Sequence, residues 1–495
     1  MQFQQQGKKN FDKFFDKSVI TRIGKRSGFV QRKPKKISAY HFVVGFIISC
    51  CIGNYTFSEW AFQIGLLSGK RVSKQGVFDR LHASTTVFAK QLLEEALLQQ
   101  AVKDFTSSLF KAFGKVLLQD STTLRLPQIL AAMFPGNHSR GVQKAVARIQ
   151  SILDIKAMKF IEFSLGAFTQ NDQSASGSII SLVKKGDLVI RDLGYFSIAV
   201  FDKLIKAQAH FLSRLRYGVT ITDRQGKLIL LKDLLKHKHG VDRWVYIGSE
   251  KKVLVRLVMI PVPPLQAAEK IRKAKQDRDA RLNHSKEYYQ WLRFNVYITT
   301  VDKDVWTASQ VYQAYRVRWQ IEIIFKSWKT GFNLQHILHE GCTNEHRVRV
   351  TIFLMLLFIC LFMKQIYVRY KTMVEKKANK TISLLKLSLF VNNNLKEIIA
   401  MPDKLLKEII MLHCCYDKRS DRTNMTDLYQ ENENQLDANA PLRGSNEYNQ
   451  AFACTPYLFL IQYLMGCVPI TDILCRPHQP GSVQARLGDA AANHV

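Results

Sequence analysis

Short apolar runs that lead into an aspartate most constrain the fold of this chain. "GKVLLQDST" reaches Asp120 after its apolar residues, and "GDLVIRDLGYFS" does the same before Asp192. Such runs, bounded by turn residues, predict buried strands. Between them, "VARIQSILDI" and "AMKFIEFSLGAF" predict a hairpin that turns at Lys156, and "FDKLIKAQAHFLSRLRYG" predicts a helix followed by a strand. Strands first, then strands alternating with a helix, indicate an α/β or α+β sheet layer.

The segments on either side have a different character. Residues 1–40 predict a basic, poorly ordered arm, and the pattern from about 41 to 112 is helical. Between about 218 and 292 the β-type runs "VTIT", "KLILL", "RWVYIG" and "LVRLVMIPVP" are followed by a basic, helix-like stretch, so we expect a β-rich insertion. After 345 the pattern is helical again, with a polar linker at 418–450. The expected division is therefore 1–112, 113–217, 218–292, 293–345 and 346–495.

The charge of the chain points to a polyanionic partner. Lys and Arg number 72 against 40 Asp and Glu, which gives a net charge of +32. Residues 1–40 hold 11 basic and 2 acidic side chains, so most of the surplus is spread over the rest of the chain. A dispersed positive charge is typical of a track for a phosphate backbone, with nucleic acid as the first candidate and an anionic membrane surface as the second.

Neither the cysteines nor the apolar runs favour secretion or a membrane span. The nine cysteines show no CxxC spacing, which fits a reducing cytosol. "FVVGFIISCCIG" has 12 residues and "VTIFLMLLFICLFM" has 14, whereas about 18–20 are needed to span the hydrocarbon layer. We therefore expect buried helices, no membrane association and a cytoplasmic protein.

The stretch "SGKRVSKQGVFDRL" has the spacing of a helix-turn-helix element. A turn at Ser68-Gly69 and a cap at Ser73 would begin a short helix that carries Lys74, Gln75 and Arg80. These three side chains are candidates for DNA contact. A plain helical hairpin with no DNA role explains the same pattern.

The segment "YRVRWQIEIIFKSWK" keeps one acidic residue among basic and aromatic ones. At about 100° per residue, Tyr315, Arg318, Glu322 and Lys329 fall within roughly a 60° arc of one helix face. An amphipathic helix with solvated charges and an internal ion pair is the ordinary explanation. A separate apolar stripe, which predicts the buried face, consists of Val317, Ile321, Ile324, Phe325 and Trp328.

Asp120, Asp192 and Glu322 together suggest a divalent-metal site. A carboxylate at the end of a buried strand needs a partner or a cation. Taken singly, Asp120 could cap a turn and Asp192 could form an Asx turn. Taken together, the three acids could hold two Mg²⁺ or Mn²⁺ ions that activate a water or 3′-hydroxyl for attack on a phosphodiester. Arg318 could then grip a phosphate, with Tyr315 as a hydroxyl donor and Lys329 on the next phosphates.

The spacing Tyr315-x2-Arg318-x3-Glu322-x6-Lys329 resembles the Tyr-Arg-Glu-Lys signature of bacterial insertion-sequence transposases of the IS-four family, within the DDE class. "LLQDSTTL", "VIRDLGYFS" and "HFLSRLRYGVTITD" are similar to the first-acid, second-acid and following-strand segments of that family, in the same order. The resemblance covers about residues 113–345.

This resemblance implies a ribonuclease-H-like mixed-sheet core interrupted by a β-rich insertion and flanked by helical N- and C-terminal regions. It implies that Asp120, Asp192 and Glu322 form the DDE triad, and that a dimer pairs two transposon ends, cuts at terminal inverted repeats and joins the 3′-hydroxyls to target DNA. Relatives excise through a hairpin with a flipped base stacked on an indole. The candidates for that indole are Trp291 first and Trp244 second, and Trp319 is expected to pack near the same strand.

Three rival functions remain at this stage: a nuclease that cuts without joining, a catalytically idle DNA-binding relative of a transposase, and a peripheral membrane protein. Two further signals carry less weight. The spacing of His336, His339, Cys342 and His346 matches no zinc motif. His138 and Arg140 are expected in a solvated turn.

Overall fold

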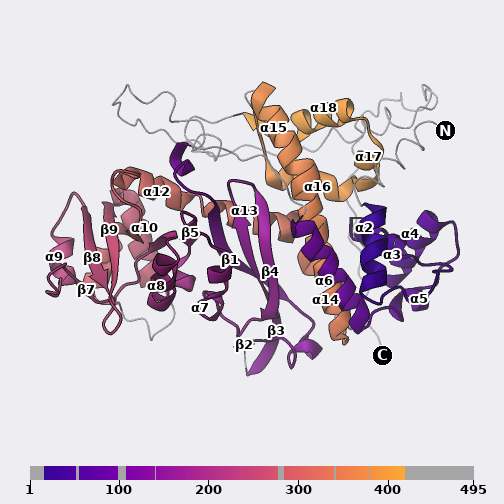
Figure 1. Cartoon of the computed structure of the whole chain (residues 1–495), viewed down its shortest axis with the longest axis horizontal. Coiled ribbons are helices and arrows are strands. Elements are labelled where there is room, and N and C mark those ends of the chain that lie inside the picture. The colour runs from indigo at the N-terminus through magenta and orange to yellow at the C-terminus, as the bar shows by residue number, and fades with distance from the viewer. Residues whose placement is uncertain are drawn as a thin grey trace, which may run out of the picture. The chain divides into compact units, whose positions relative to one another are not determined.

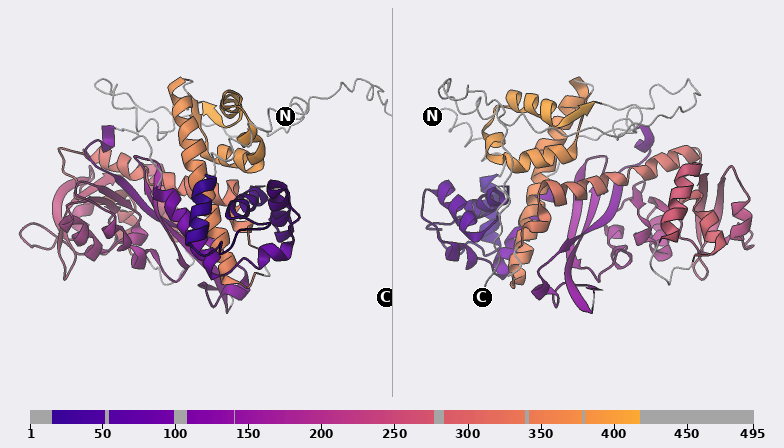
Figure 2. Two further views of the ribbon diagram at one scale, coloured as in Figure 1. Left: turned by 45° about the vertical axis from the view of Figure 1, so that its right-hand side comes forward. Right: turned by 180° about the vertical axis from the view of Figure 1, so that it is seen from behind.

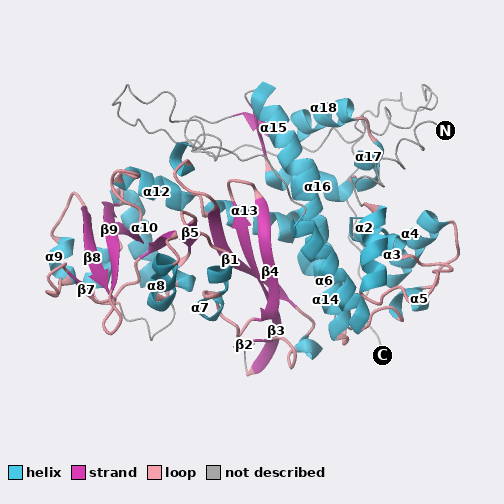
Figure 3. Cartoon of the chain, viewed as in Figure 1, coloured by secondary structure: helices cyan, strands magenta, loops and turns pink. Residues whose placement is uncertain are grey.

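The computed structural model describes residues 16–51, 55–98, 108–139, 141–276, 284–338, 342–377 and 380–417. Figure 1 labels many of the elements and shows chain order by colour, and Figure 3 separates strands from helices. The strands that build the main sheet come from the middle of the chain, and helices precede and follow them in sequence. The expected α/β class is therefore confirmed.

Five strands form the centre of the sheet in the order β4-β3-β1-β5-β6. β3 is antiparallel to both β1 and β4, whereas β5 is parallel to both β1 and β6. This order, with these directions, is that of a ribonuclease-H-like sheet. The hairpin around Lys156 and the helix α8 before β6 lie where the sequence predicts them. The bounds are β1 Val116–Arg125, β2 Pro135–Ser139, β3 Val142–Asp154, β4 Lys159–Ala167, β5 Leu188–Arg191, α8 Ile198–Lys206 and β6 His210–Arg214.

The β-rich segment extends the same sheet. β10 (Phe294–Thr299) is antiparallel to β6 on one side and to β9 (Val253–Pro261) on the other, and β8 (Val241–Ile247) and β7 (Ile221–Thr222) follow outward. The run "KLILL" is not a strand, contrary to expectation. It makes one bridge, from Leu228 to Thr222, and then enters α9. The helices of this segment are α9 Leu231–Leu235, α10 Pro264–Lys275 and α11 Lys286–Trp291.

Side chains of the central strands alternate between two cores, one on each face of the sheet. Leu118, Ile190 and Leu212 belong to one core, which includes residues of α12 (Ala308–Arg316) and α13 (Trp319–Lys326). Leu117, Val189 and Phe211 belong to the other, which includes residues of α8. The segment with the Tyr-Arg-Glu-Lys spacing therefore covers the face of the sheet from which Leu118 projects.

The N-terminal helices pack against the C-terminal ones. α6 contacts both α14 and β4, and Figure 2 shows α6 and α14 from two further sides. The expected disordered arm is partly wrong, because α2 forms within it and buries Ile20 and Ile23; residues 1–15 lie outside the described part. The bounds are α2 Lys17–Arg26, α3 Ala39–Cys51, α4 Phe57–Ser68, α5 Lys74–Phe78 and α6 Ala83–Leu98.

The helix after residue 344 is longer than its apolar run predicts. α14 (Glu345–Phe362) continues through a π-helical turn into α15 (Val368–Lys377). By length and composition the stretch Glu345–Lys371 could cross a membrane, but 83% of its most apolar window is buried inside the protein, as in a core helix. The remaining elements are β11 Lys380–Ile382, α16 Leu384–Asn393, α17 Leu395–Ala400, α18 Asp403–His413 and β12 Cys415–Asp417. The linker at 418–450 lies outside the described residues.

Candidate active site

Asp120 and Asp192 lie level with each other on neighbouring parallel strands. The register pairs Leu118 of β1 with Ile190 of β5, and both side chains enter the same core. Each aspartate follows two residues later, so both carboxylates project from that same face of the sheet. The sheet therefore brings together two acids that lie far apart in the sequence.

The strand β1 does not end at Asp120, which corrects the expectation. It continues to Arg125 because β3 keeps pairing with it beyond this point. What ends here is the pairing with β5, whose last registered pair is Gln119 and Arg191. Asp120 therefore lies where the pairing of β1 with β5 ends, one residue beyond its last registered pair.

The third acid comes from a helical segment that is interrupted. α12 ends at Arg316, α13 begins at Trp319, and a π-helical turn follows from Ser327 to Gly331. Glu322 lies in the first turn of α13, one turn beyond Arg318. The single long helix expected from the sequence is thus three consecutive pieces, although Tyr315, Arg318 and Glu322 still face the same region.

The guanidinium of Arg318 holds all three carboxylates. Its Nη2 lies 2.5 Å from Glu322 Oε1, its Nη1 3.3 Å from Asp120 Oδ2, and its Nε 3.7 Å from Asp192 Oδ1. The Arg318 side chain is only 12% exposed. Burial lowers the pKa of Arg318, but the nearby Asp192, Tyr315, Glu322 and Asp120 outweigh it, and the net shift is upward. One buried guanidinium therefore lies within reach of three converging acids.

Tyr315 fixes the second acid. Its hydroxyl donates to Asp192 Oδ1 at 3.2 Å, while the tyrosine itself is 4% exposed. Burial and the charge of Asp192 raise the pKa of Tyr315, so the hydroxyl keeps its proton and remains a donor. Burial likewise raises the pKa of Asp120 to about 7, opposed by the Ser121 backbone N–H and by Arg318, and supported by Asp192 and Glu322.

The chemistry of the donors fits a hard divalent cation. Carboxylate oxygens are the ligands that Mg²⁺ and Mn²⁺ prefer, and these three already converge on a cationic group. In the part of the chain that the structure describes, no three His, Cys, Asp or Glu side chains are close enough to hold an ion while Arg318 lies between them. The three acids therefore fit the metal by the chemistry of their oxygens, and Arg318 occupies the space between them.

The raised pKa of Asp120 predicts how the stability of the metal-free protein depends on pH. Its folded value of about 7 exceeds the ordinary 3.8, so the folded state holds a proton that the unfolded state releases between these values. Stability from this group is present at low pH and is lost as pH rises to about 7. We expect Asp120→Asn, measured in EDTA, to raise the melting temperature more at pH 8 than at pH 5, because the free energy of unfolding of the wild type loses up to about 3 kcal/mol between pH 5 and about 7 through this group.

The matched control for this measurement is Asp304→Asn on an exposed loop. Its melting temperature should follow that of the wild type at both pH values. A difference between Asp120→Asn and the wild type that stays constant or shrinks from pH 5 to pH 8 contradicts the prediction.

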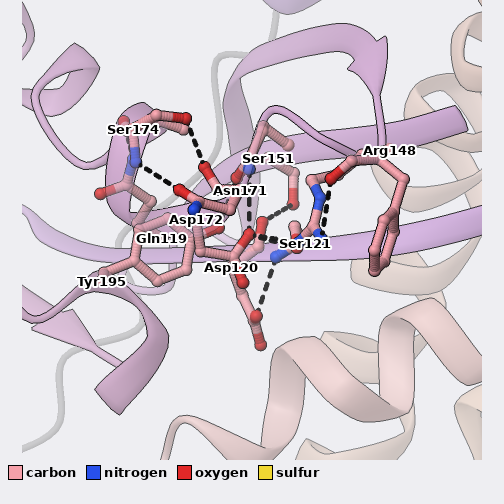
Figure 4. A network of polar contacts seen from close by, with 12 residues as sticks. Gln119, Asp120, Ser121, Arg148, Ser151, Asn171, Asp172, Ser174 and Tyr195 are labelled. Atoms are coloured by element: carbon pink, nitrogen blue, oxygen red, sulfur yellow. Dashed lines mark hydrogen bonds and ion pairs between the residues drawn. The ribbon is translucent and has the colours of Figure 1, made fainter. Parts of the chain in front are cut away.

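A fourth acid, Asp172, was not singled out from the sequence. It begins α7 (Asp172–Ala175), and its Oδ1 accepts from Ser121 Oγ at 2.7 Å, Arg148 Nη1 at 2.7 Å and Gln150 Nε2 at 3.0 Å (Figure 4). Ser121 directly follows Asp120 and projects to the opposite face of the sheet. The only signal in the sequence was a polar loop, "QNDQSAS", after the second strand of the predicted hairpin.

The Asp172 network reaches both aspartates of the site. The Ser121 backbone N–H donates to Asp120 Oδ1 at 2.8 Å. On the other side, a Cβ at Gly194 would lie 3.2 Å from Asp172 Oδ2, so Asp172 packs against the turn that follows Asp192. Arg191 Nη2 also donates to Gln119 Oε1, which ties together the residues just before the two acids. Asp172 is thus placed to position Asp120 and Asp192 without touching Arg318's side of the sheet.

We expect Asp172→Ala to lower the rate of DNA cleavage and the apparent Mg²⁺ affinity by about 10–100-fold, because outer partners of a metal site orient its ligands. Affinity for DNA in Ca²⁺ should stay close to that of the wild type. Asp172→Asn keeps an acceptor oxygen and should lose less. Asp233→Ala, an exposed acid that pairs with Lys236, serves as control. Equal losses of cleavage rate in Asp172→Ala and the control Asp233→Ala would contradict a positioning role. A variant that loses DNA affinity alone would contradict it as well.

The tryptophans lie in very different surroundings. Trp291, the first candidate for base stacking, is 9% exposed and belongs to a buried core, where its ring contacts Tyr217. A buried indole presents no free face, so this burial argues against a stacking role for Trp291, which stays a prediction. Trp244 is half-buried in β8, whereas Trp319, directly after Arg318, is 62% exposed. Of the three, Trp319 has the indole most open to a ligand.

The other predicted DNA contacts lie outside this cluster. Lys329 is half-buried in the π-helical turn, and burial lowers its pKa.

The helix-turn-helix candidate forms only a short helix. Ser73 caps α5 through Gly76 N, as the sequence predicts, but α5 has only five residues. Lys74 is exposed, and Gln75 Nε2 donates to Asp79 Oδ1 at 2.6 Å. Arg80 lines a pocket of about 900 Å³ whose basic residues are Arg32, Lys33, Lys35, Lys36, Arg71 and Arg80.

The histidine cluster forms no metal centre among the described residues. Cys342 is buried, and the His346 ring nitrogen Nδ1 pairs with Thr86 Oγ1 at 3.1 Å. His339 and the His336 side chain lie outside the described part. His138 is exposed in β2 rather than in a turn, and Arg140 is outside the described residues.

Comparison with known proteins identifies the family. The family model described as "Transposase DDE domain" matches residues 111–363, about half of the chain. The transposase for insertion sequence element IS231B of Bacillus thuringiensis subsp. berliner is 26% identical over 343 residues, which cover 64% of this chain and 71% of that protein. The corresponding values for the IS231F transposase of Bacillus thuringiensis subsp. israelensis are 23%, 74% and 80%, and for the IS1151 transposase of Clostridium perfringens 23%, 66% and 74%.

Among solved structures, the piggyBac transposase synaptic complex with hairpin DNA aligns with a TM-score of 0.40 and 9% identity, over 85% of this chain and 87% of that one. The family assignment rests on the sequence match, which spans the segments that carry Asp120, Asp192 and Glu322. The chain belongs to the Transposase DDE domain family and is a DNA transposase of the DDE class.

Proposed function

We propose that this transposase cuts DNA at terminal inverted repeats and joins the freed 3′-hydroxyls to target DNA by a reaction that depends on two Mg²⁺ or Mn²⁺ ions. The observation that carries the proposal is the convergence of Asp120, Asp192 and Glu322 on one guanidinium at the sheet edge. Three carboxylates at a basic surface suit phosphoryl transfer, because they bind cations where a polyanion is held.

Each residue of the cluster has a distinct role in this proposal. Asp120, Asp192 and Glu322 hold the ions. When bound, the ions supply an activated water or 3′-hydroxyl and neutralise charge on the leaving oxygen. Tyr315 keeps Asp192 oriented through its hydroxyl. Arg318 can exchange its carboxylate partners for a phosphate, which a guanidinium binds with two parallel hydrogen bonds.

The remaining parts of the chain bind and arrange the DNA. Residues 1–112, with Lys74, Gln75 and Arg80, recognise the transposon end, and Lys329 contacts the next phosphates. Trp319 stacks on a base near the cleavage point, a role supported by its 62% exposure. The segment 218–292 is an insertion between the core parts 113–217 and 293–345. The region 346–495 supports a homodimer that pairs two ends, acting on the nucleoid in the bacterial cytoplasm.

A strand-transfer assay tests the proposal. Purified protein is incubated with labelled duplex that ends in the terminal repeat of its own element and with a supercoiled target plasmid, in Mg²⁺, Ca²⁺ or EDTA. We expect joined products in Mg²⁺ only, and none from a duplex of scrambled end sequence. Cleavage without joining would instead establish a nuclease, and binding without either reaction would establish an idle DNA-binding protein.

A further inference from the structure

The row of the sheet that carries the two aspartates continues onto a third strand. Ile190 of β5 is registered with Leu212 of β6, and both side chains enter the same core. Two residues further on, Arg214 therefore stands level with Asp192 and on the same face, about 5 Å away across the sheet. Asp120, Asp192 and Arg214 thus form one line: two acids and then a cation.

Arg214 is held beside the acids by aromatic rings. Its guanidinium carbon lies 5.4 Å from the centre of the Tyr315 ring, and Arg318 lies 5.9 Å from the centre of the same ring. Tyr297, registered opposite Arg214 on β10, places its ring 5.0 Å from that of Tyr315. The two arginines differ in their partners, because Arg318 holds three carboxylates, whereas Arg214 is exposed and has no acidic partner among the described residues.

A second cation comes from the β-rich segment. Lys270, in α10, is half-buried and donates to Asn295 Oδ1 at 2.8 Å. Asn295 lies two residues before Tyr297 on β10, so the same face of that strand carries both. Burial and the charge of Arg214 lower the pKa of Lys270 to about 8. Arg214 and Lys270 thus lie close enough to interact, and neither forms an ion pair with an acid in the described part of the chain, which is an arrangement that suits an incoming anion.

We propose that Arg214 and Lys270 form a binding site for one backbone phosphodiester of the DNA strand being cut, next to the reacting phosphate on the side of β6 and β10. The site rests on the proposed function, because the acids in the same row define where the reacting phosphate lies. A guanidinium stacked on a fixed ring and an ammonium held by an amide offer donors already in place for phosphate oxygens.

The position of the site explains one feature of the sheet. The β-rich segment joins the core sheet through the pairing of β9 with β10, and Lys270 of α10 reaches Asn295 of β10, the strand next to β6. Lys270 lies 78 positions after Asp192 and 52 before Glu322 in the sequence, yet Asn295 and Arg214 bring it to the same edge. In this proposal the β-rich segment supplies, through Lys270, a second cation beside the row of Asp120, Asp192 and Arg214.

The test combines removal of one phosphate charge from the DNA with removal of one cation from the protein. A labelled terminal-repeat duplex carries a single methylphosphonate, walked across the phosphates around the cleavage point, and binding is measured in Ca²⁺ and cleavage in Mg²⁺. In wild type we expect one position to weaken binding by about 10–100-fold, the usual effect of losing a charged hydrogen bond. Arg214→Met and Lys270→Met should show a similar loss on unmodified DNA and little further loss at that position.

The salt dependence gives a second readout. Each lost phosphate contact lowers the slope of log affinity against log salt by about 0.9, so each variant should show a shallower slope. Lys238→Met, an exposed lysine in the turn before β8, removes the same charge and should leave both readouts at wild-type values. If Arg214→Met does not fold, Lys270→Met carries both readouts, and Arg214→Lys, which keeps the charge, carries the methylphosphonate readout alone.

Independent, multiplying losses from the variants and from every methylphosphonate overturn the inference, as does an unchanged salt slope. These outcomes differ from failure of the proposed function. In that case wild type does not cut or join its own terminal repeat, whereas here wild type cuts normally and only the coupling between Arg214, Lys270 and the phosphate is missing.

Discussion

Glu322→Gln will bind terminal-repeat DNA with nearly wild-type affinity but will neither cut nor join it. The glutamine keeps the shape of the side chain and removes the charge that α13 contributes to the cluster around Arg318. A neutral amide is a weak ligand for a hard cation, so the reaction rate in Mg²⁺ should fall by at least about 10³-fold. Asp120→Asn and Asp192→Asn should give losses of the same order.

Glu287→Gln is the matched control, because Glu287 is an exposed glutamate in the first turn of another helix, α11. It should cut and join at the wild-type rate. The measurement is the yield of nicked, double-strand-cut and joined products over time, with DNA affinity determined separately in Ca²⁺. Residual strand transfer in Glu322→Gln within about tenfold of wild type would remove Glu322 from the catalytic set.

Much of the central sheet could be predicted from the sequence, because β5 and the first half of β1 are buried on both faces and read as apolar runs with clear ends. The register of β1 and β5 then follows from the fold class, and with it the meeting of Asp120 and Asp192. The sequence could not show that β1 continues past Asp120, because the polar residues that follow it pair with β3 and look like a turn. Short local patterns contain no information about which neighbour continues a strand.

The features that local patterns do not show share a physical cause. Trp291 was ranked first for stacking because it lies near the end of the β-rich segment, but burial depends on packing against Tyr217 and the rest of a distant core. Asp172 was missed because its partners Ser121, Arg148 and Gln150 come from two other strands. Helical spacing, in contrast, is local, and it correctly placed Tyr315, Arg318 and Glu322 toward one region.

Arg318→Gln will be less stable than wild type without divalent ions, and divalent ions will restore much of the loss. The guanidinium is the cation shared by Asp120, Asp192 and Glu322, and its removal leaves three carboxylates close together with no positive charge between them. Removing one partner of such a buried pair typically costs about 3–5 kcal/mol, and the partial exposure of Asp192 and Glu322 places this case near the lower end.

Thermal melting in EDTA, Mg²⁺ and Ca²⁺ measures the loss of stability in Arg318→Gln, with Lys326→Gln, an exposed cation at the end of α13, as control. Added Ca²⁺ should raise the melting temperature of Arg318→Gln more than that of wild type, because in the variant the ion no longer competes with a resident guanidinium. An Arg318→Gln protein that matches wild type in EDTA would mean that the three acids do not depend on this residue for their charge balance.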